Sequence, residues 1–390
     1  MLRMIYSATA AGAPRNYGTA IDQLQSDGEQ SLQDFPKAQA GFALPEPALT
    51  AAIERWLTQR GPSTNPVVVM VHGFLYDPSQ PMGPNSDSPF ESVYGMPPGT
   101  QNSMSWLPLV AECDEHGGNH SENAIAFCYK SEAGIAEYGG AGWSNNYQYA
   151  VFDQAPLAAR ALATILFCLG SHNVTVRVLA HSLGTRTLSQ AIRLLRARMP
   201  ANLDRVVMLD GAEFCVDAAA NFENCGFDVV NIANRSDRVL AIGAQQMCHP
   251  IRPTGSLESQ VIGFDGLGTT DRWLDLQIDR QPLVNWFAAA NAPDGIPYTI
   301  QAEAQDETHP FAGLDHWSCY TNDGNRALVR DLLFSDVMTV AQLKQHRVPS
   351  SVDSAAYGRF RQVAPPATPQ SRMERQRLLY PTNFGGGGGG

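Results

Sequence analysis

The stretch Val176-Arg177-Val178-Leu179-Ala180-His181-Ser182-Leu183-Gly184 decides how this chain folds. An apolar run of strand character leads directly into a segment whose apolar residues recur at helical spacing. A sharp turn between strand and helix holds its central residue in a strained conformation. It also requires small residues two positions before and after, because the helix and a neighbouring strand pass close by. Ala180 and Gly184 meet this requirement around Ser182.

Further apolar runs of strand length lie on both sides of this stretch. They alternate with segments of helical periodicity, and this order predicts βαβ crossovers. The sequence therefore predicts an α/β fold, with a mostly parallel central sheet and helices on both faces. The expected strands cover residues 67–71, 124–129, 174–180, 205–209 and 228–232, with a sixth at 261–264 and a short run at 3–7; the expected helices cover 47–59, 153–169, 183–199 and 325–334.

The domain organisation follows from where this pattern is interrupted. Residues 1–362 are expected to form a single domain, with irregular insertions near 76–103 and 241–310. From residue 363 the chain is rich in proline and arginine and ends in six glycines. Such a composition buries too little apolar surface to become ordered, so residues 363–390 are expected to be a disordered tail.

Charge and cysteine usage exclude several classes of partner. The 390 residues carry a formal net charge of −11, which repels phosphate backbones, so no nucleic-acid partner is expected. The seven cysteines lack zinc-ligand spacing, so no metal or cofactor is expected, and free thiols are favoured over a Cys215–Cys225 disulfide. No segment is expected to span a membrane. The N-terminus is interpreted as mature chain, which favours a cytoplasmic location.

Ser182 is the first candidate for chemistry. At a sharp strand-to-helix turn its hydroxyl is expected to be exposed to substrate, and the helix N-terminus then points at a developing oxyanion. A serine at this position also serves as an ordinary helix N-cap. The buried strand before it and the amphipathic helix after it favour a nucleophile.

Together with Val71-His72-Gly73-Phe74, this stretch resembles the α/β-hydrolase superfamily over roughly residues 65–335. The resemblance implies a serine esterase with Ser182 as nucleophile. It also implies that the backbone N–H groups of Phe74 and Leu183 form the oxyanion hole.

The resemblance has one departure, because Ala180 stands where the family usually has glycine. A weaker resemblance, to a little-characterised group of bacterial α/β-hydrolases, rests on residues 4–9, 236–240 and 315–317. It implies carboxylesterase activity without defining a substrate.

The family's chain order, serine then acid then histidine, implies a base that follows Ser182. His316 is the candidate, because it lies in a loop-like stretch ahead of the last expected helix. His309 is the reserve. Of the other two later histidines, His249 and His346, the second lies in a polar helix end and is interpreted as solvated.

The acid is implied to follow a strand between the nucleophile and the base. Asp237 follows the fifth expected strand and Asp210 follows the fourth. Each also suits a turn or a helix cap. Asp237 is preferred and Asp210 is the reserve. The acid would fix the tautomer of His316 and stabilise its imidazolium.

The residues expected to form the substrate pocket adjoin the two oxyanion segments. They are Leu75, Tyr76 and His181, and the aromatic side chains of Phe74, Phe90, Tyr94 and Trp106 are further candidates. His72 is interpreted as a core histidine with a satisfied ring. Arg186, Arg193 and Arg196 are interpreted as a solvated helix face.

The sequence thus predicts a serine hydrolase that cleaves a small-molecule carboxylic ester through an acyl-enzyme intermediate. A thioesterase, lipase or amidase would use the same triad. A protein of another class, a non-catalytic binding protein with the α/β-hydrolase fold, would lack or misplace at least one triad position. The natural substrate and the oligomeric state stay open.

Overall fold

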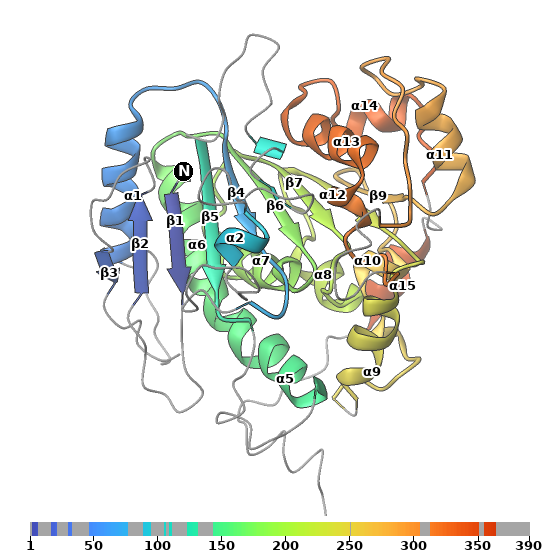
Figure 1. Ribbon diagram of the computed structural model, residues 1–390, viewed down its shortest axis with the longest axis horizontal. Helices are drawn as coiled ribbons and strands as arrows, with labels where there is room; N and C mark the ends of the chain where they lie inside the picture. Colours follow the sequence, from blue (N-terminus) through green and yellow to red (C-terminus); the bar gives the residue numbers. More distant parts are fainter. Residues whose placement is uncertain are drawn as a thin grey trace, which may run out of the picture.

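In the described part of the chain, nine strands form one sheet with the order β3-β2-β1-β5-β4-β6-β7-β8-β9 (Figure 1). The computed structural model describes residues 2–6, 17–21, 30–32, 47–76, 89–94, 105–106, 109–110, 123–131, 143–249, 251–304, 313–350 and 355–363. Expectations for residues outside these ranges, including the disordered tail and most of the loop at 76–103, lie outside the described residues.

Seven neighbouring strands of the sheet run parallel, and β2 and β3 add an antiparallel edge. The strands are β1 Leu2–Tyr6, β2 Tyr17–Ile21, β3 Gln30–Leu32, β4 Val67–Val71, β5 Ala124–Tyr129, β6 Val176–His181, β7 Leu203–Leu209, β8 Asp228–Ala233 and β9 Trp273–Gln277. Parallel strands end at the same edge, so the loops that follow β4, β6, β7, β8 and β9 gather at one edge of the sheet.

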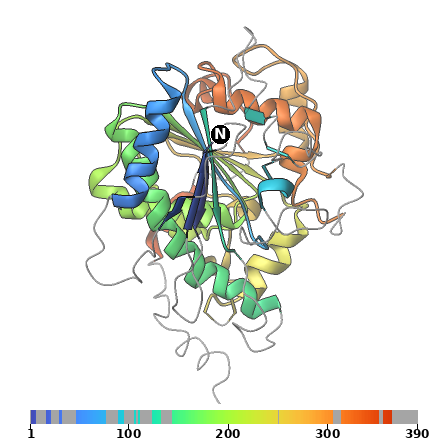
Figure 2. The ribbon, with the colours of Figure 1, turned by 60° about the vertical axis from the view of Figure 1, so that its left-hand side comes forward.

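Apolar residues cover both faces of this sheet. Along β4, Val67, Val69 and Val71 belong to one hydrophobic core, and Val68 and Met70 belong to the other. The first core is covered by α1 Pro47–Arg60, α6 Ala155–Ser171, α7 Leu183–Leu195, α8 Cys215–Asn221 and α15 Ala355–Gln362, and the second by α11 Gln281–Ala288, α13 Asp323–Phe334 and α14 Val340–Gln345. Figure 2 shows helices on both sides. The predicted α/β architecture is confirmed.

The remaining elements are short and mostly belong to connections near the sheet. They are α2 Pro89–Ser92, α5 Trp143–Tyr149, α9 Gln245–Met247, α10 Ile262–Asp265, α12 Ser318–Thr321, the 3₁₀ turns Arg196–Arg198 and Leu257–Ser259, and the π-helices Ala150–Gln154 and Leu240–Ala244.

Cys215 and Cys225 are both free thiols, as expected.

The helix predicted from residue 153 begins earlier than expected. The helices α5, Ala150–Gln154 and α6 follow one another without a break, so Pro156 lies inside a continuous helical run. Proline has no N–H for an ordinary α-helical bond and clashes with the preceding turn. The wider π-helical turn just before it accommodates the proline.

The sixth predicted strand is wrong. Ile262–Asp265 is the short helix α10, and the sixth strand of the main parallel block is instead β9. A four-residue apolar run cannot distinguish a buried strand from a buried helix by periodicity. Gly263 packs so tightly that an added Cβ would lie 2.2 Å from the Gly211 nitrogen. The insertion expected at 241–310 is therefore partly an ordered strand of the sheet.

One helical segment is longer and more apolar than expected. By length and composition alone, Asn146–Ser171 could cross a membrane, which corrects the expectation that no segment could. However, 76% of its most apolar window is buried inside the protein. That burial is typical of a core helix, here α6 packed against α7 and α1.

Candidate active site

Ser182 lies at a strained turn between β6 and α7. Its backbone dihedral angles are φ 51° and ψ −124°, which non-glycine residues rarely adopt. Its N–H donates to Leu209 O of β7 at 3.0 Å, and its carbonyl accepts from Thr185 and Ala212. A Cβ on Gly184 would lie 2.4 Å from Val71 O, so the helix and β4 approach as closely as the sequence predicts.

The loop after β4 lies against this turn. A Cβ on Gly73 would lie 2.9 Å from the Ser182 Cβ and 3.4 Å from its Oγ, so the chain leading to Phe74 passes the serine directly. Within the described residues, neither Phe74 N–H nor Leu183 N–H donates a hydrogen bond. Leu183 is the first residue of α7, where helical N–H groups have no partner within the helix. Both donors are therefore available near Ser182.

His316 and Asp237 form a buried hydrogen-bonded pair. Nδ1 of His316 lies 2.5 Å from Asp237 Oδ2, and the two residues are 4% and 0% exposed. A carboxylate oxygen only accepts, so His316 donates through Nδ1–H and its Nε2 is left as the basic nitrogen. The other oxygen of Asp237 accepts from Leu240 N at 3.0 Å. No hydrogen bond joins His316 to Asp210.

Asn234 connects the loop of the acid with the loop of the base. Its amide nitrogen lies 3.3 Å from Asp315 O, 3.1 Å from Ser318 Oγ and 2.8 Å from Ala302 O. Its Oδ1 accepts from Ser236 N at 2.9 Å. The sequence analysis gave Asn234 no role. An asparagine directly after a buried strand and three residues before the candidate acid was the available signal.

The hydrogen bond between the serine and the base of the predicted triad is not formed. Among the described residues, the Ser182 hydroxyl has no hydrogen-bond partner, His316 included. The serine is also only 5% exposed, whereas open exposure was expected. His316 instead contacts His181, the residue before Ser182, and the centroids of the two rings lie 4.7 Å apart. Such bonds are often long in the absence of substrate and tighten when it binds.

His181 packs beside the base. Its Nε2–H donates to His316 O at 3.0 Å, and its ring also contacts Trp106 and Tyr320. Burial lowers the pKa of His181 well below its usual value, and the neighbouring His316 lowers it further. His181 therefore stays neutral and supports the backbone of the base.

His72 is a core histidine. Its Nδ1 lies 2.9 Å from Gly73 O, its Nε2 accepts from Tyr129 N at 3.0 Å, and its ring stacks on Tyr129. Burial lowers the pKa of His72 to about 3. The ring is neutral and both nitrogens have partners, as the sequence analysis expected.

The candidate pocket residues fall into two groups. Leu75 and Tyr76 are half-buried beside Phe74, and Tyr76 N is held by Ser131 Oγ at 3.0 Å. Tyr94 instead belongs to the core, where its hydroxyl donates to Phe127 O at 2.7 Å. Trp106, also fully buried, packs behind His181. The side chain of Phe90 lies outside the described residues.

Arg186 corrects the expectation of a solvated helix face. It is buried and binds Glu213 Oε1 at 2.6 Å and Asp217 Oδ2 at 3.0 Å, and Arg252 binds the same oxygen of Asp217 at 2.8 Å. These acids come from the loop after β7 and from α8, so a helical pattern alone could not reveal them. Arg193 and Arg196 are exposed as expected.

The other candidate histidines that the structure describes, His249 and His346, make no hydrogen bond with this pair. His346 is exposed at the end of α14 and its Nδ1 lies 3.2 Å from Asn291 O. His249 is exposed. His309 lies outside the described residues.

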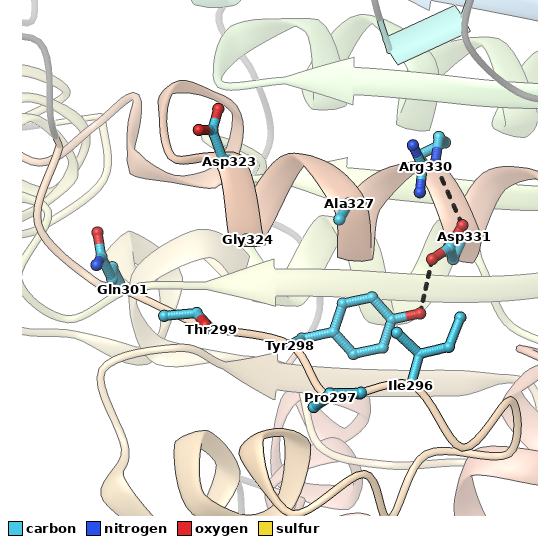
Figure 3. A pocket seen from close by; sticks show the side chains of 10 residues that line it. All are labelled: Ile296, Pro297, Tyr298, Thr299, Gln301, Asp323, Gly324, Ala327, Arg330 and Asp331. Atoms are coloured by element: carbon cyan, nitrogen blue, oxygen red, sulfur yellow. Dashed lines mark hydrogen bonds and ion pairs between the residues drawn. The ribbon is translucent and has the colours of Figure 1, made fainter.

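A recess of about 410 Å³ lies elsewhere on the protein, between the segment 296–301 and α13 (Figure 3). None of the residues that line it belongs to the Ser182 site. Its most prominent polar groups are paired with each other, since the Tyr298 hydroxyl lies 2.7 Å from Asp331 Oδ2.

Within the described ranges, no group of three or more His, Cys, Asp or Glu side chains is arranged to hold a metal ion. In comparisons with known proteins, the chain matches no family model and no curated protein sequence.

Proposed function

We propose that this protein is a serine hydrolase that cleaves a carboxylic ester through an acyl-enzyme intermediate. The observation that carries the proposal is the buried 2.5 Å pair of His316 Nδ1 and Asp237 Oδ2, next to a serine in a strained strand-to-helix turn. These three residue types in these roles recur on unrelated folds and are recognised by geometry.

In the proposed reaction, Ser182 Oγ attacks the carbonyl carbon of the ester while His316 Nε2 takes its proton. The negative charge on the carbonyl oxygen is then stabilised by the N–H groups of Phe74 and Leu183. Protonated His316 passes the proton to the departing alcohol, and water later releases the acid from Ser182. Asp237 keeps its charge and holds the imidazole throughout.

One observation supports a competing candidate. The nearly buried Ser182 without a hydrogen bond to His316 also suits a non-catalytic binding protein. A fluorophosphonate probe separates the two candidates, because it reacts only with an activated and accessible serine. We expect one labelled serine in the wild-type protein and none in Ser182→Ala or in Ser182→Gly, which tolerates the positive φ.

Ser189→Ala is the matched control, since Ser189 lies on the same helix and its hydroxyl hydrogen-bonds Asn221 and Glu213, neither of which belongs to the proposed triad. It should label normally. Labelling that persists in both Ser182 variants, or its absence from the wild type, contradicts the proposal. If the wild-type protein is labelled, its hydrolysis rates should then be measured with p-nitrophenyl esters of increasing acyl length, a thioester and an anilide. The preferred substrate distinguishes an esterase from a thioesterase, lipase or amidase.

A further inference from the structure

A second buried carboxyl group lies beside the proposed triad. Asp210 directly follows β7, the strand between those that lead to Ser182 and Asp237, and its N–H donates to Ile232 O of β8 at 3.1 Å. The residue is completely buried. The backbone therefore fixes a carboxyl group at the edge of the sheet where the serine and the acid lie.

The backbone at Asp210 is strained and tightly enclosed. Its φ of 44° lies in the left-handed region, where an aspartate is disfavoured by about 1 kcal/mol. A Cβ on Gly263 would lie 2.4 Å from the Asp210 carbonyl carbon. The position is thus held by its surroundings, so the side chain cannot easily turn away to solvent.

The charges around Asp210 disfavour its ionisation. Neither of its carboxyl oxygens accepts a hydrogen bond from an N–H or O–H group of the described residues. Burial raises the pKa of Asp210 well above its usual value, and the charge of Asp237 raises it further. A hydrogen bond from the Cys319 thiol lowers the pKa of Asp210, whereas the charges of Asp315 and Asp279 raise it. Two neighbouring carboxyl groups in a buried site cannot easily both be charged.

We propose that Asp210 is a positioning residue that keeps its proton, so that no second charged carboxylate competes with Asp237 for the ring of His316. This inference rests on the proposed function. A second negative charge close to the ring would stabilise the imidazolium and weaken His316 as a base.

The proposal predicts how substitutions combine. Asp210→Asn imitates the protonated acid and suits the left-handed backbone, so it should change kcat by less than about threefold and leave the acidic limb of the pH–rate profile in place.

Asp237→Asn should lower kcat by about 10³–10⁴. In that variant Asp210 no longer faces a charge and ionises more readily. Its residual activity should therefore rise with pH, and adding Asp210→Asn should remove at least a further tenfold.

A merely structural role for Asp210 predicts equal effects of Asp210→Asn in both backgrounds, and that result would overturn the proposal. A shift of the acidic limb to lower pH by about one unit in Asp210→Asn would overturn it too, because it would show an ionised Asp210. If Asp210→Asn folds poorly, Asp210→Gly tests the same cycle, since glycine adopts this φ freely.

An infrared measurement makes the test independent of catalysis. At pH 7 the difference spectrum between the wild-type protein and Asp210→Asn should contain the carbonyl band of one protonated carboxylic acid. If that band is present but the fluorophosphonate probe labels nothing, the proposed function fails while the protonation of Asp210 stands. If Ser182 is labelled but the band is absent, only the inference about Asp210 fails.

Discussion

Gly184→Ala is the substitution that tests most directly how the turn builds the site. The added Cβ would lie 2.4 Å from Val71 O and 2.5 Å from His72 O, whereas ordinary contact begins at 3.4 Å. Both obstacles are backbone atoms, so the start of α7 and the end of β4 must separate by about 1 Å. Overpacking of this kind lowers the free energy of unfolding by about 1–3 kcal/mol.

The same movement should affect activity more than stability. Leu183 moves with the helix and Phe74 stays with β4, so the two N–H donors for the oxyanion are pulled apart. A misplacement of about 1 Å typically lowers the rate by about 100-fold. We expect this loss in kcat for p-nitrophenyl acetate, measured together with urea unfolding of the same samples.

Gly226→Ala is the control, because an added Cβ there meets nothing within 4 Å and the residue is exposed. It should keep the wild-type rate and change the unfolding free energy by less than about 0.5 kcal/mol. If Gly184→Ala also stays within twofold of the wild-type rate, the close approach of α7 and β4 does not shape the site, and the reasoning is refuted.

Three further predictions follow from the contacts around this site. Between pH 6.5 and about 3, His72 binds fewer protons in the folded protein than in the unfolded chain, so its contribution to stability is present above pH 6.5 and is lost as pH falls. The loss in the free energy of unfolding amounts to about 2 kcal/mol at pH 5. Urea unfolding at pH 7 and pH 5 should therefore show a smaller loss of stability for His72→Gln than for the wild type. Arg186→Met leaves Glu213 buried without its cation and leaves Asp217 paired with Arg252 alone, so it should lower the unfolding free energy by about 3–5 kcal/mol. The exposed Arg193→Met should cost less than about 0.5 kcal/mol, and equal effects would contradict the assigned ion pairs. Asn234→Ala removes the hydrogen bonds that connect the loop of the acid with the loop of the base, so kcat should fall at least about tenfold while the fluorophosphonate probe still labels Ser182. An unchanged kcat would show that His316 needs no such support.

The sequence was most informative where the deciding signal is local. The strands at 67–71 and 124–129 have the predicted bounds, because a continuous apolar run records burial on both faces. The turn at Ser182 also follows from adjacent residues. By contrast, β9 was missed, because its five residues lie within a long irregular stretch and receive their partner only from β8.

Arg186 shows what a local pattern cannot reveal. On α7 alone, an arginine at that position suits a solvated face, as Arg193 does. Its burial depends on Glu213 and Asp217, which lie 27 and 31 residues further along the chain. The choice between Asp210 and Asp237 has the same character, since each follows a strand and only the fold decides which one reaches His316.

The spacing of the strands gives a physical reason for that choice. From the serine oxygen to the acid, an imidazole and its two hydrogen bonds span about 8 Å. Neighbouring strands lie about 4.8 Å apart, so a residue after β7 is one spacing from Ser182, and a residue after β8 is two. Asp237 therefore suits the far side of the imidazole, whereas Asp210 is too close to the serine for a linear arrangement.

The same spacing limits the residual activity expected of Asp237→Asn, because an ionised Asp210 would reach His316 only in a distorted geometry. Near-wild-type kcat in that variant would mean that the ring of His316 turns freely toward β7, and this account of the site would then be wrong.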